Sequence, residues 1–294
     1  MSEKHLRFAI FGKEHQAKKS AMIESVLAVL SRRGAVMTID RPFLEILQSL
    51  DIDTQGVAAF DGDDFDADFV ISLGGDGTML KAAARVGAKN IPIVGVNIGR
   101  LGFLSDTKPT EMDMVVDALY NGEYKLENHS AITVETEGAE MQGQRIALND
   151  IAVLKRDTAA MISIETSIDK EYVVTYQADG LIVATPTGST AYSLSNGGPI
   201  VAPNADVLCL TPVAPHSMNI RPIVIDGNSE VALKVVSRSH NFLLAVDGMS
   251  VTLKEGTTVR IRKAAHSVKI VKLPNKHYYS TLREKMSWGL DNRA

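Results

Sequence analysis

A five-residue run, Gly74-Gly75-Asp76-Gly77-Thr78, directly follows the apolar stretch Phe69–Leu73 and constrains the fold of this 294-residue chain more than any other segment. The residues after it, Thr78–Ala84, are mostly good helix formers, so the run predicts a turn between a strand and a helix. Glycines adopt backbone angles that other residues avoid and let main-chain N–H groups approach an anion. Because a helix start also favours negative charge, we predict a phosphate-binding turn made by Gly74, Gly75, Gly77 and Thr78.

Asp76 is the one carboxylate in this turn, and it would repel a phosphate that it merely faced. Its placement therefore needs a reason other than anion binding. A general base is the obvious one, because a fixed carboxylate can take the proton from a hydroxyl as that oxygen attacks phosphorus. The alternative is an ordinary strand-to-helix turn in which Asp76 caps the helix.

The first hundred or so residues alternate between strand and helix periodicity, which predicts a doubly wound parallel sheet, an α/β fold. The expected strands are Leu6–Phe11, Ala35–Ile39, Asp68–Leu73 and Ile91–Val96, and the expected helices are Gln16–Arg33, Pro42–Leu50 and the segment after Gly77. Ligands of such sheets bind beyond the carboxyl ends of the strands. The glycine run falls at such an end, which favours a functional role for it.

After a helical segment at Glu111–Tyr120, many short β-rich runs follow one another with turn residues between them. This pattern predicts an all-β, sandwich-like second domain. We expect Val259–Ile261 and Val268–Leu273 to be separate strands and Tyr279–Gly289 to be a closing amphipathic helix. The predicted domains are residues 1–106, residues 107–275, and a helical tail, 276–294, that returns to the first domain.

Composition limits the possible partners. The chain is 45% hydrophobic and 22% charged with a net charge of −4, so its surface as a whole does not attract nucleic acid. No signal peptide and no long apolar span is present, which predicts no membrane partner. The single cysteine, Cys209, lies in an apolar run and fits a cytoplasmic protein without disulfides. The scattered histidines show no metal-ligand spacing, so we predict no protein-built metal site.

Two further segments could bind a ligand. Seven of the eleven residues Thr185–Ser195 carry hydroxyl groups and none is charged, a composition that suits the sugars, amides and phosphates of a nucleotide. A Ser/Thr-rich surface loop is the alternative. Asn149-Asp150 could grip two ribose hydroxyls, or could be only a turn between strands. Asp247-Gly248 is comparably ambiguous, and an Asp-Gly pair is more often only a hairpin turn than part of a binding site. The basic residues from Arg260 to Lys276 alternate with apolar ones and predict a solvated strand face.

Taken together, these motifs resemble the NAD kinase family over nearly the whole chain. The resemblance rests on Gly74–Thr78, Asn149-Asp150 and Asp179–Pro199, and it extends to Gly99–Leu104, the Asp247-Gly248 turn and Leu282–Gly289. The glycine run alone is shared with diacylglycerol and sphingosine kinase relatives, and Pro186–Ser195 separates the two groups. The family's fold, an α/β domain joined to a β-rich domain with the active site between them, agrees with the periodicity.

The resemblance implies phosphorylation of the 2′-hydroxyl on the adenosine ribose of NAD, with ATP as donor and a divalent cation, Mg²⁺, held largely by ATP. Asp76 would be the general base. The residues implied to bind NAD are Asp76, Gly77, Lys81, Asn149, Asp150, Asp179, Thr190, Ala191, Tyr192, Ser193, Leu194 and Ser195. Family members are commonly homodimers or homotetramers, so a similar assembly is implied here.

The chain departs from the family pattern at two positions. The usual Asn-Glu pair is Asn149-Asp150 here, one methylene shorter, and Met249 stands where many members have Gln. Two other functions stay open at this point: a lipid kinase of the diacylglycerol type that uses the same glycine turn, and a non-catalytic NAD(P)-binding sensor. The presence of Asp76 instead of a neutral residue argues against the sensor.

Overall fold

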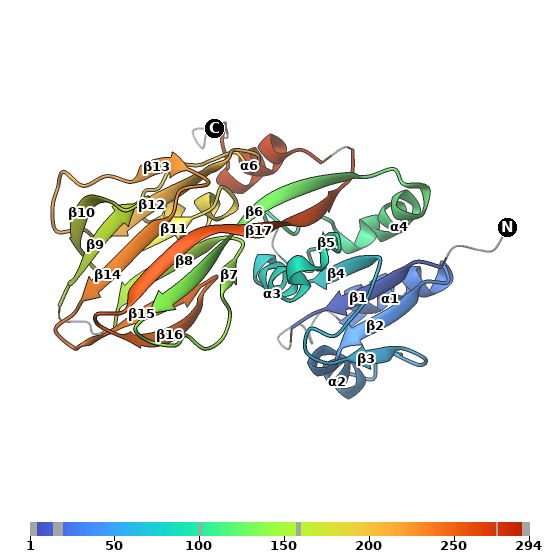
Figure 1. Cartoon of the computed structure of the whole chain (residues 1–294). Helices are drawn as coiled ribbons and strands as arrows, with labels where there is room; N and C mark the ends of the chain where they lie inside the picture. The colour runs from blue at the N-terminus through green and yellow to red at the C-terminus, as the bar shows by residue number, and fades with distance from the viewer. Residues whose placement is uncertain (1–4, 14–19, 100–101, 157–159, 275, 290–294) are drawn as a thin grey trace. The chain divides into compact units, whose positions relative to one another are not determined.

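The computed structural model describes residues 5–13, 20–99, 102–156, 160–274 and 276–289, which group into two compact units. Unit 1 comprises Met1–Asn128 and Val268–Ala294, and unit 2 comprises His129–Ser267. Two long strands, β6 (Lys125–Glu137) and β17 (Thr258–Lys272), each begin in one unit and end in the other (Figure 1). The division of the chain at residues 106 and 275 stays a prediction.

Unit 1 contains the predicted parallel sheet. Its strands are β1 (Arg7–Phe11), β2 (Val36–Asp40), β3 (Ala58–Phe60), β4 (Phe69–Leu73) and β5 (Ile93–Val96). They lie in the order β3-β2-β1-β4-β5, and the end of β17 lies beside β5. Chain order reverses between β1 and β4, and in open α/β sheets this switch point forms the ligand crevice at the carboxyl ends of the strands. The glycine run follows β4 directly.

The helices of unit 1 are α1 (Ser20–Arg32), α2 (Arg41–Ser49), α3 (Asp76–Val86), α4 (Met112–Asn121) and α6 (Tyr278–Met286), with short 3-10 turns η2 (Gly87–Lys89) and η3 (Pro109–Glu111). Helix α1 buries Ile23, Val26, Leu27 and Leu30, as its helical spacing predicts, whereas Met22, which was placed on the same apolar face, is exposed. Gly34, at φ 64°, takes the left-handed conformation that ends such a helix. The first four residues of the predicted helix, 16–19, lie outside the described residues.

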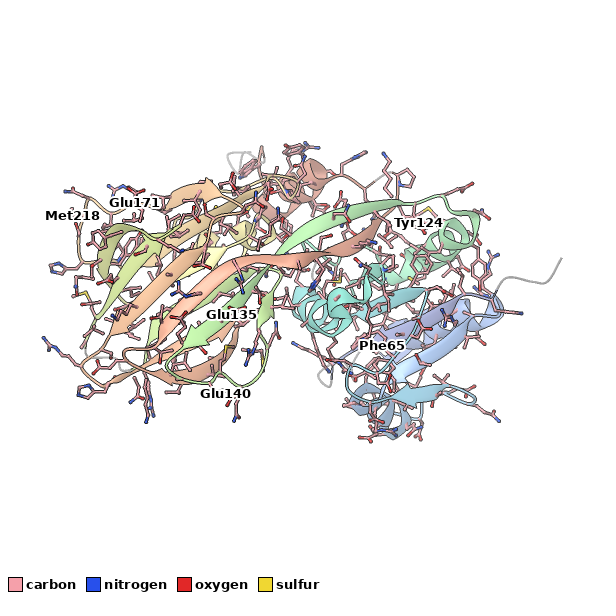
Figure 2. The ribbon with its side chains drawn as sticks, in the orientation of Figure 1. Phe65, Tyr124, Glu135, Glu140, Glu171 and Met218 are labelled. Carbon is pink, nitrogen blue, oxygen red and sulfur yellow. The ribbon has the colours of Figure 1, made fainter. Side chains whose placement is uncertain are left out.

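Aromatic side chains close the core of unit 1 on both faces of the sheet. Phe11 meets Phe65 edge-on, with ring centroids 5.5 Å apart, and Phe69 meets Tyr124 at 5.6 Å. Phe65 and Tyr124 are labelled in Figure 2. Contacts of this kind contribute about 0.5–1.5 kcal/mol each beyond the burial of area. Phe11 lies on β1 and Phe69 on β4, so these contacts pack the two strands at the switch point against the rest of the core.

Unit 2 is the predicted antiparallel β domain, and it is built from two sheets. One contains β9 (Ile162–Ile168), β10 (Glu171–Ala178), β14 (Val231–Val236) and β17, with β6 and β7 (Ile146–Ala147) at its side. The other contains β8 (Asp150–Lys155), β11 (Gly180–Ala184), β12 (Val207–Val213), β13 (Ile223–Asp226), β15 (Asn241–Val246) and β16 (Met249–Lys254). A single core cluster draws buried residues from both sheets, as in a sandwich.

Sequence periodicity was wrong at one long strand and missed two short ones. Residues 258–272 form one strand, β17, where two were predicted, because residues 262–267 belong to the strand without continuing the apolar alternation of its two ends. Strands β3 and β16 were not predicted. The predicted solvated basic face holds only in part: Arg262 is exposed and paired with Glu135, whereas Lys272 is buried and bonded to Asp106 at 2.6 Å. Among the described residues, no helix is long and apolar enough to span a membrane.

Candidate active site

The glycine run forms the predicted turn from β4 into α3, but its glycines are not there for unusual backbone angles. None of Gly74, Gly75 and Gly77 has a positive φ, and Gly75 lies at φ −96° as the residue that precedes the helix. A Cβ on Gly75 would meet no atom within 4 Å. The protein itself therefore does not require glycine at Gly75, and the open space beside its backbone is available to a ligand.

The carboxylate of Asp76 lies at the first residue of α3 and is fixed by the segment that follows β5. Its Oδ2 accepts the backbone N–H of Phe103 at 2.9 Å, and its Oδ1 accepts those of Leu104 and Ser105 at 3.1 and 3.0 Å. A Cβ on Gly102 would overlap this carboxylate, so the two segments pack in direct contact. An ionised carboxylate accepts about four hydrogen bonds, which leaves one acceptor position, on Oδ2, open to a ligand.

Lys13 is a functional candidate that sequence reasoning missed. It follows β1, on the other side of the switch point from Asp76, and a Cβ on Gly77 would stand 3.2 Å from its Nζ. Its ammonium group forms no ion pair within the described ranges of the chain. The Gly12-Lys13 pair directly after the first strand was the signal in the sequence, but its nearness to Gly77 depends on the strand order.

Lys81, an implied NAD contact, projects from the second turn of α3 and is already bonded to a buried acid. Its Nζ lies 2.8 Å from Oδ2 of Asp40, which is 1% exposed, and Oδ1 of Asp40 accepts from Arg85 at 2.6 Å. Asp40 ends β2, so this network ties α3 to the carboxyl edge of the sheet. The Lys81 side chain remains 40% exposed, which leaves its ammonium group accessible.

In unit 2, the backbone of Leu148–Asp150 is held on both sides by hydrogen bonds. The Asp247 carboxylate accepts the N–H groups of Leu148, Asn149 and Asp150 at 2.8, 2.8 and 3.1 Å. On the other side, Thr185 donates its hydroxyl to Leu148 O at 2.5 Å and its N–H to Asn149 O at 2.9 Å.

The side chains of Asn149 and Asp150, by contrast, make no hydrogen bond or ion pair to any residue that the structure describes. Asp150 is nevertheless only 6% exposed. Burial, followed by the negative charge of Asp247, raises the pKa of Asp150 to about 7. A buried carboxyl group and an amide that are both unpartnered, on a fixed backbone, are what a site for hydroxyl groups requires. Asp150 also begins β8, so the pair is more than a turn.

The hydroxyl-rich segment folds into the 3-10 turn η4 (Thr187–Thr190) and the single-turn helix α5 (Tyr192–Ser195). Several of its hydroxyls hold the segment itself together, for example Ser193, which is buried and 2.8 Å from the Thr211 hydroxyl. Thr190 and Leu194 are half-buried with Ala191, while Tyr192 and Ser195 are exposed. The exposed side of this segment can therefore meet a ligand, and the buried hydroxyls fix its shape.

Asp179 is not brought beside Asn149 and Asp150. It pairs with Lys155 at 2.7 Å, at the end of the β8–β11 pair where Leu154 lies opposite Gly180. Asp150 lies opposite Ala184, five residues along from Asp179, which at strand spacing is roughly 17 Å away. One compact group cannot contact both acids, whereas an extended dinucleotide can.

A metal cage was not predicted, and within the described part of the chain no group of three or more His, Cys, Asp or Glu residues is placed to hold a metal ion. Arg100 and Leu101, which belong to the resemblance, lie outside the described residues.

Comparison with known protein families gives matches on both halves of the chain. Residues 8–124 match the ATP-NAD kinase N-terminal domain, and residues 148–273 match the ATP-NAD kinase C-terminal domain. A NAD kinase of Bacteroides fragilis is 51% identical over 290 residues, which cover 98% of this chain and 100% of the relative. A NAD kinase of Porphyromonas gingivalis is 39% identical over 284 residues, which cover 96% and 98%.

Solved structures agree with these matches. A NAD kinase from Archaeoglobus fulgidus in complex with ATP is 26% identical, with a TM-score of 0.71, and the match covers 96% of this chain and 99% of that one. The yeast NADH kinase complexed with NADH has a TM-score of 0.86 at 24% identity, covers 99% and 90%, and supports the fold. No comparison supports a lipid kinase or a sensor. The chain therefore belongs to the NAD kinase family.

Proposed function

We propose that this enzyme transfers the γ-phosphoryl group of ATP to the 2′-hydroxyl on the adenosine ribose of NAD, with Asp76 as the general base. The observation that supports this role is the fixed Asp76 carboxylate with one open acceptor position on Oδ2. The ribose hydroxyl would donate its hydrogen bond there, and the carboxylate would take that proton as the oxygen attacks phosphorus. Such a base acts mainly by alignment, because phosphoryl transfer needs the attacking oxygen and the phosphorus in line.

The phosphates of ATP would lie against the backbone of Gly74, Gly75, Gly77 and Thr78 at the start of α3. The helix dipole favours an anion there, and the N–H groups of Gly74 and Thr78 already donate to Val96 O and Gly75 O, both at 2.9 Å. Lys13, with its ammonium group near Gly77, would neutralise charge that develops on the transferred group. Mg²⁺ would be bound by the ATP phosphates, since the described residues offer it no cage of their own.

NAD would be held by residues from both units. In unit 1 these are Asp76, Gly77 and the accessible ammonium group of Lys81. In unit 2, the unpartnered side chains of Asn149 and Asp150 would bind ribose hydroxyls. Asp179 and the segment Thr190, Ala191, Tyr192, Ser193, Leu194 and Ser195 would contact the rest of the dinucleotide.

The decisive experiment is Asp76→Asn, assayed for NADP formation from NAD, ATP and magnesium. Asparagine has one acceptor oxygen and no basic group, so we expect kcat to fall about 100- to 10,000-fold. Because Asp76 also anchors Phe103–Ser105, the variant must be checked for NAD binding by calorimetry. Near-normal binding with lost turnover supports a base. Normal turnover excludes a base at Asp76, and loss of both NAD binding and turnover assigns Asp76 to anchoring alone.

We also propose a homodimer or homotetramer in the cytoplasm, on the family resemblance. Light scattering of the purified protein tests the first point, and cell fractionation tests the second. A monomer at micromolar concentration, or recovery outside the cytosolic fraction, would contradict the respective proposal.

A further inference from the structure

Among the described residues, Asp247 is the only one whose carboxylate accepts three hydrogen bonds from the backbone of Leu148–Asp150, the segment that carries the proposed ribose-binding pair. It lies in the two-residue turn between β15 and β16, where Val246 pairs with Met249. Both turn residues have positive φ, 47° for Asp247 and 82° for Gly248, as a type I′ hairpin requires. An ordinary hairpin of this type needs Asp247 only for its backbone, yet the side chain reaches a segment about one hundred positions earlier in the chain.

This side chain completes the hydrogen bonding of Leu148–Asp150. Asp247 accepts all three N–H groups of the segment and donates its own N–H to Asp150 O at 3.0 Å. Thr185 accounts for the two remaining carbonyls. All six backbone polar groups of the segment are thus satisfied by two residues. The direction in which the Asn149 and Asp150 side chains project is fixed before any ligand binds.

We propose that Asp247 is a positioning residue for NAD binding, which acts through the backbone of Asn149 and Asp150 and does not contact the dinucleotide itself. The proposal rests on the proposed ribose-binding role of this pair. Its physical basis is preorganisation: a rigid pair pays no ordering cost when it meets the ribose, whereas a loose pair does. Gly188 also packs directly against this segment, because a Cβ there would overlap the Asn149 carbonyl.

The test is a comparison of Asp247→Asn with Asp169→Asn in the full-length enzyme. Asp169 is a matched control, since it lies at positive φ, 50°, in the β9–β10 hairpin and accepts the Glu230 N–H at 2.8 Å. Asparagine keeps one acceptor oxygen but replaces the other with an amide NH2 group, which faces a backbone N–H and cannot accept its hydrogen bond. We expect Asp247→Asn to raise the KM for NAD about 10- to 100-fold, with the KM for ATP within about twofold. Asp169→Asn should change neither constant.

A second arm separates positioning from general stability. In an Asn149→Ala/Asp150→Ala background, Asp247→Asn should raise the KM for NAD little further, because a residue that acts through the pair has nothing left to position. Equal effects in both backgrounds would overturn the proposal, as would an unchanged KM for NAD in folded Asp247→Asn or an equal rise in Asp169→Asn. If Asn149→Ala alone leaves NAD binding unchanged, the ribose-binding role of the pair fails instead.

A measurement on the unmodified enzyme covers the case in which Asp247→Asn does not fold. Hydrogen exchange of the ligand-free protein should show the amides of Leu148, Asn149 and Asp150 as strongly protected as those inside β8. Exchange at the rate of an open loop would mean that Asp247 does not hold this segment, and would overturn the proposal.

Discussion

The Asp150 carboxyl group is buried and has no hydrogen-bond partner among the described residues, so its ionisation changes the folding stability with pH. Its pKa in the folded chain is about 7, raised from 3.8 by burial and by the charge of Asp247. Between these two values the folded state keeps a proton that the unfolded state has lost, so stability falls as pH rises through this window and the loss is complete above pH 7. The ionised form then costs up to about 4 kcal/mol, at about 1.4 kcal/mol for each pH unit.

Asp150→Asn should therefore stabilise the ligand-free enzyme, because the amide imitates the neutral acid. We expect the Tm of the variant minus that of the unmodified enzyme to grow between pH 5 and 8, as measured by calorimetry. Asp169→Asn is the control with opposite sign. Hydrogen bonds from Glu230 and Ser229 lower the pKa of Asp169, so replacing this ionised carboxylate should reduce Tm across this pH range. A Tm difference for Asp150→Asn that does not change with pH would contradict the raised pKa.

At the scale of secondary-structure elements, the start of α3 separates a structural glycine requirement from a functional one. Gly75 has an ordinary φ and open space where a Cβ would stand, so Gly75→Ala should leave Tm almost unchanged. If phosphate lies against this backbone, the methyl group will obstruct it, and the KM for ATP should rise about tenfold or more. Gly188→Ala is the contrast, because its methyl group would overlap the Asn149 carbonyl and lower Tm. An unchanged KM for ATP in Gly75→Ala would move the phosphates elsewhere.

Local periodicity predicted most elements because the burial pattern of helices such as α1 and of buried strands such as β4 is visible in a few consecutive residues. It was insufficient for β17, in which Arg262, between the two predicted strands, pairs with Glu135 on another strand. Charged residues inside a strand can be recognised only once their partners are known.

The candidate site divides in the same way. Asp76 and Asn149-Asp150 could be predicted as site residues because a glycine turn and an amide–carboxyl pair are local patterns. The supporting residues were not predictable, since each acts over a long stretch of sequence: Asp40 bonds Lys81 41 positions away, and Asp247 bonds Leu148 99 positions away. Strand order, which no local pattern specifies, brings these residues together.

At the scale of the whole molecule, the proposed NAD contacts are distributed over two units, each with its own core. NAD should therefore slow amide exchange at two places that are distant in the sequence: Gly74–Thr78 in unit 1 and Thr190–Ser195 in unit 2. ATP alone should slow exchange only in the first, because its proposed contacts lie in the turn before α3 and at Lys13.

Ligand at about 100 times its Kd should also add about 2.7 kcal/mol of stability, which makes saturation easy to verify. Hydrogen exchange with mass spectrometry measures both segments in one experiment, with the hairpin at Asp169 as an internal region that should not respond. Protection of only one segment by NAD would remove the other unit's residues from the proposed site, whereas protection of both by NAD and of one by ATP is the pattern expected of a kinase whose acceptor, and not its donor, depends on both units.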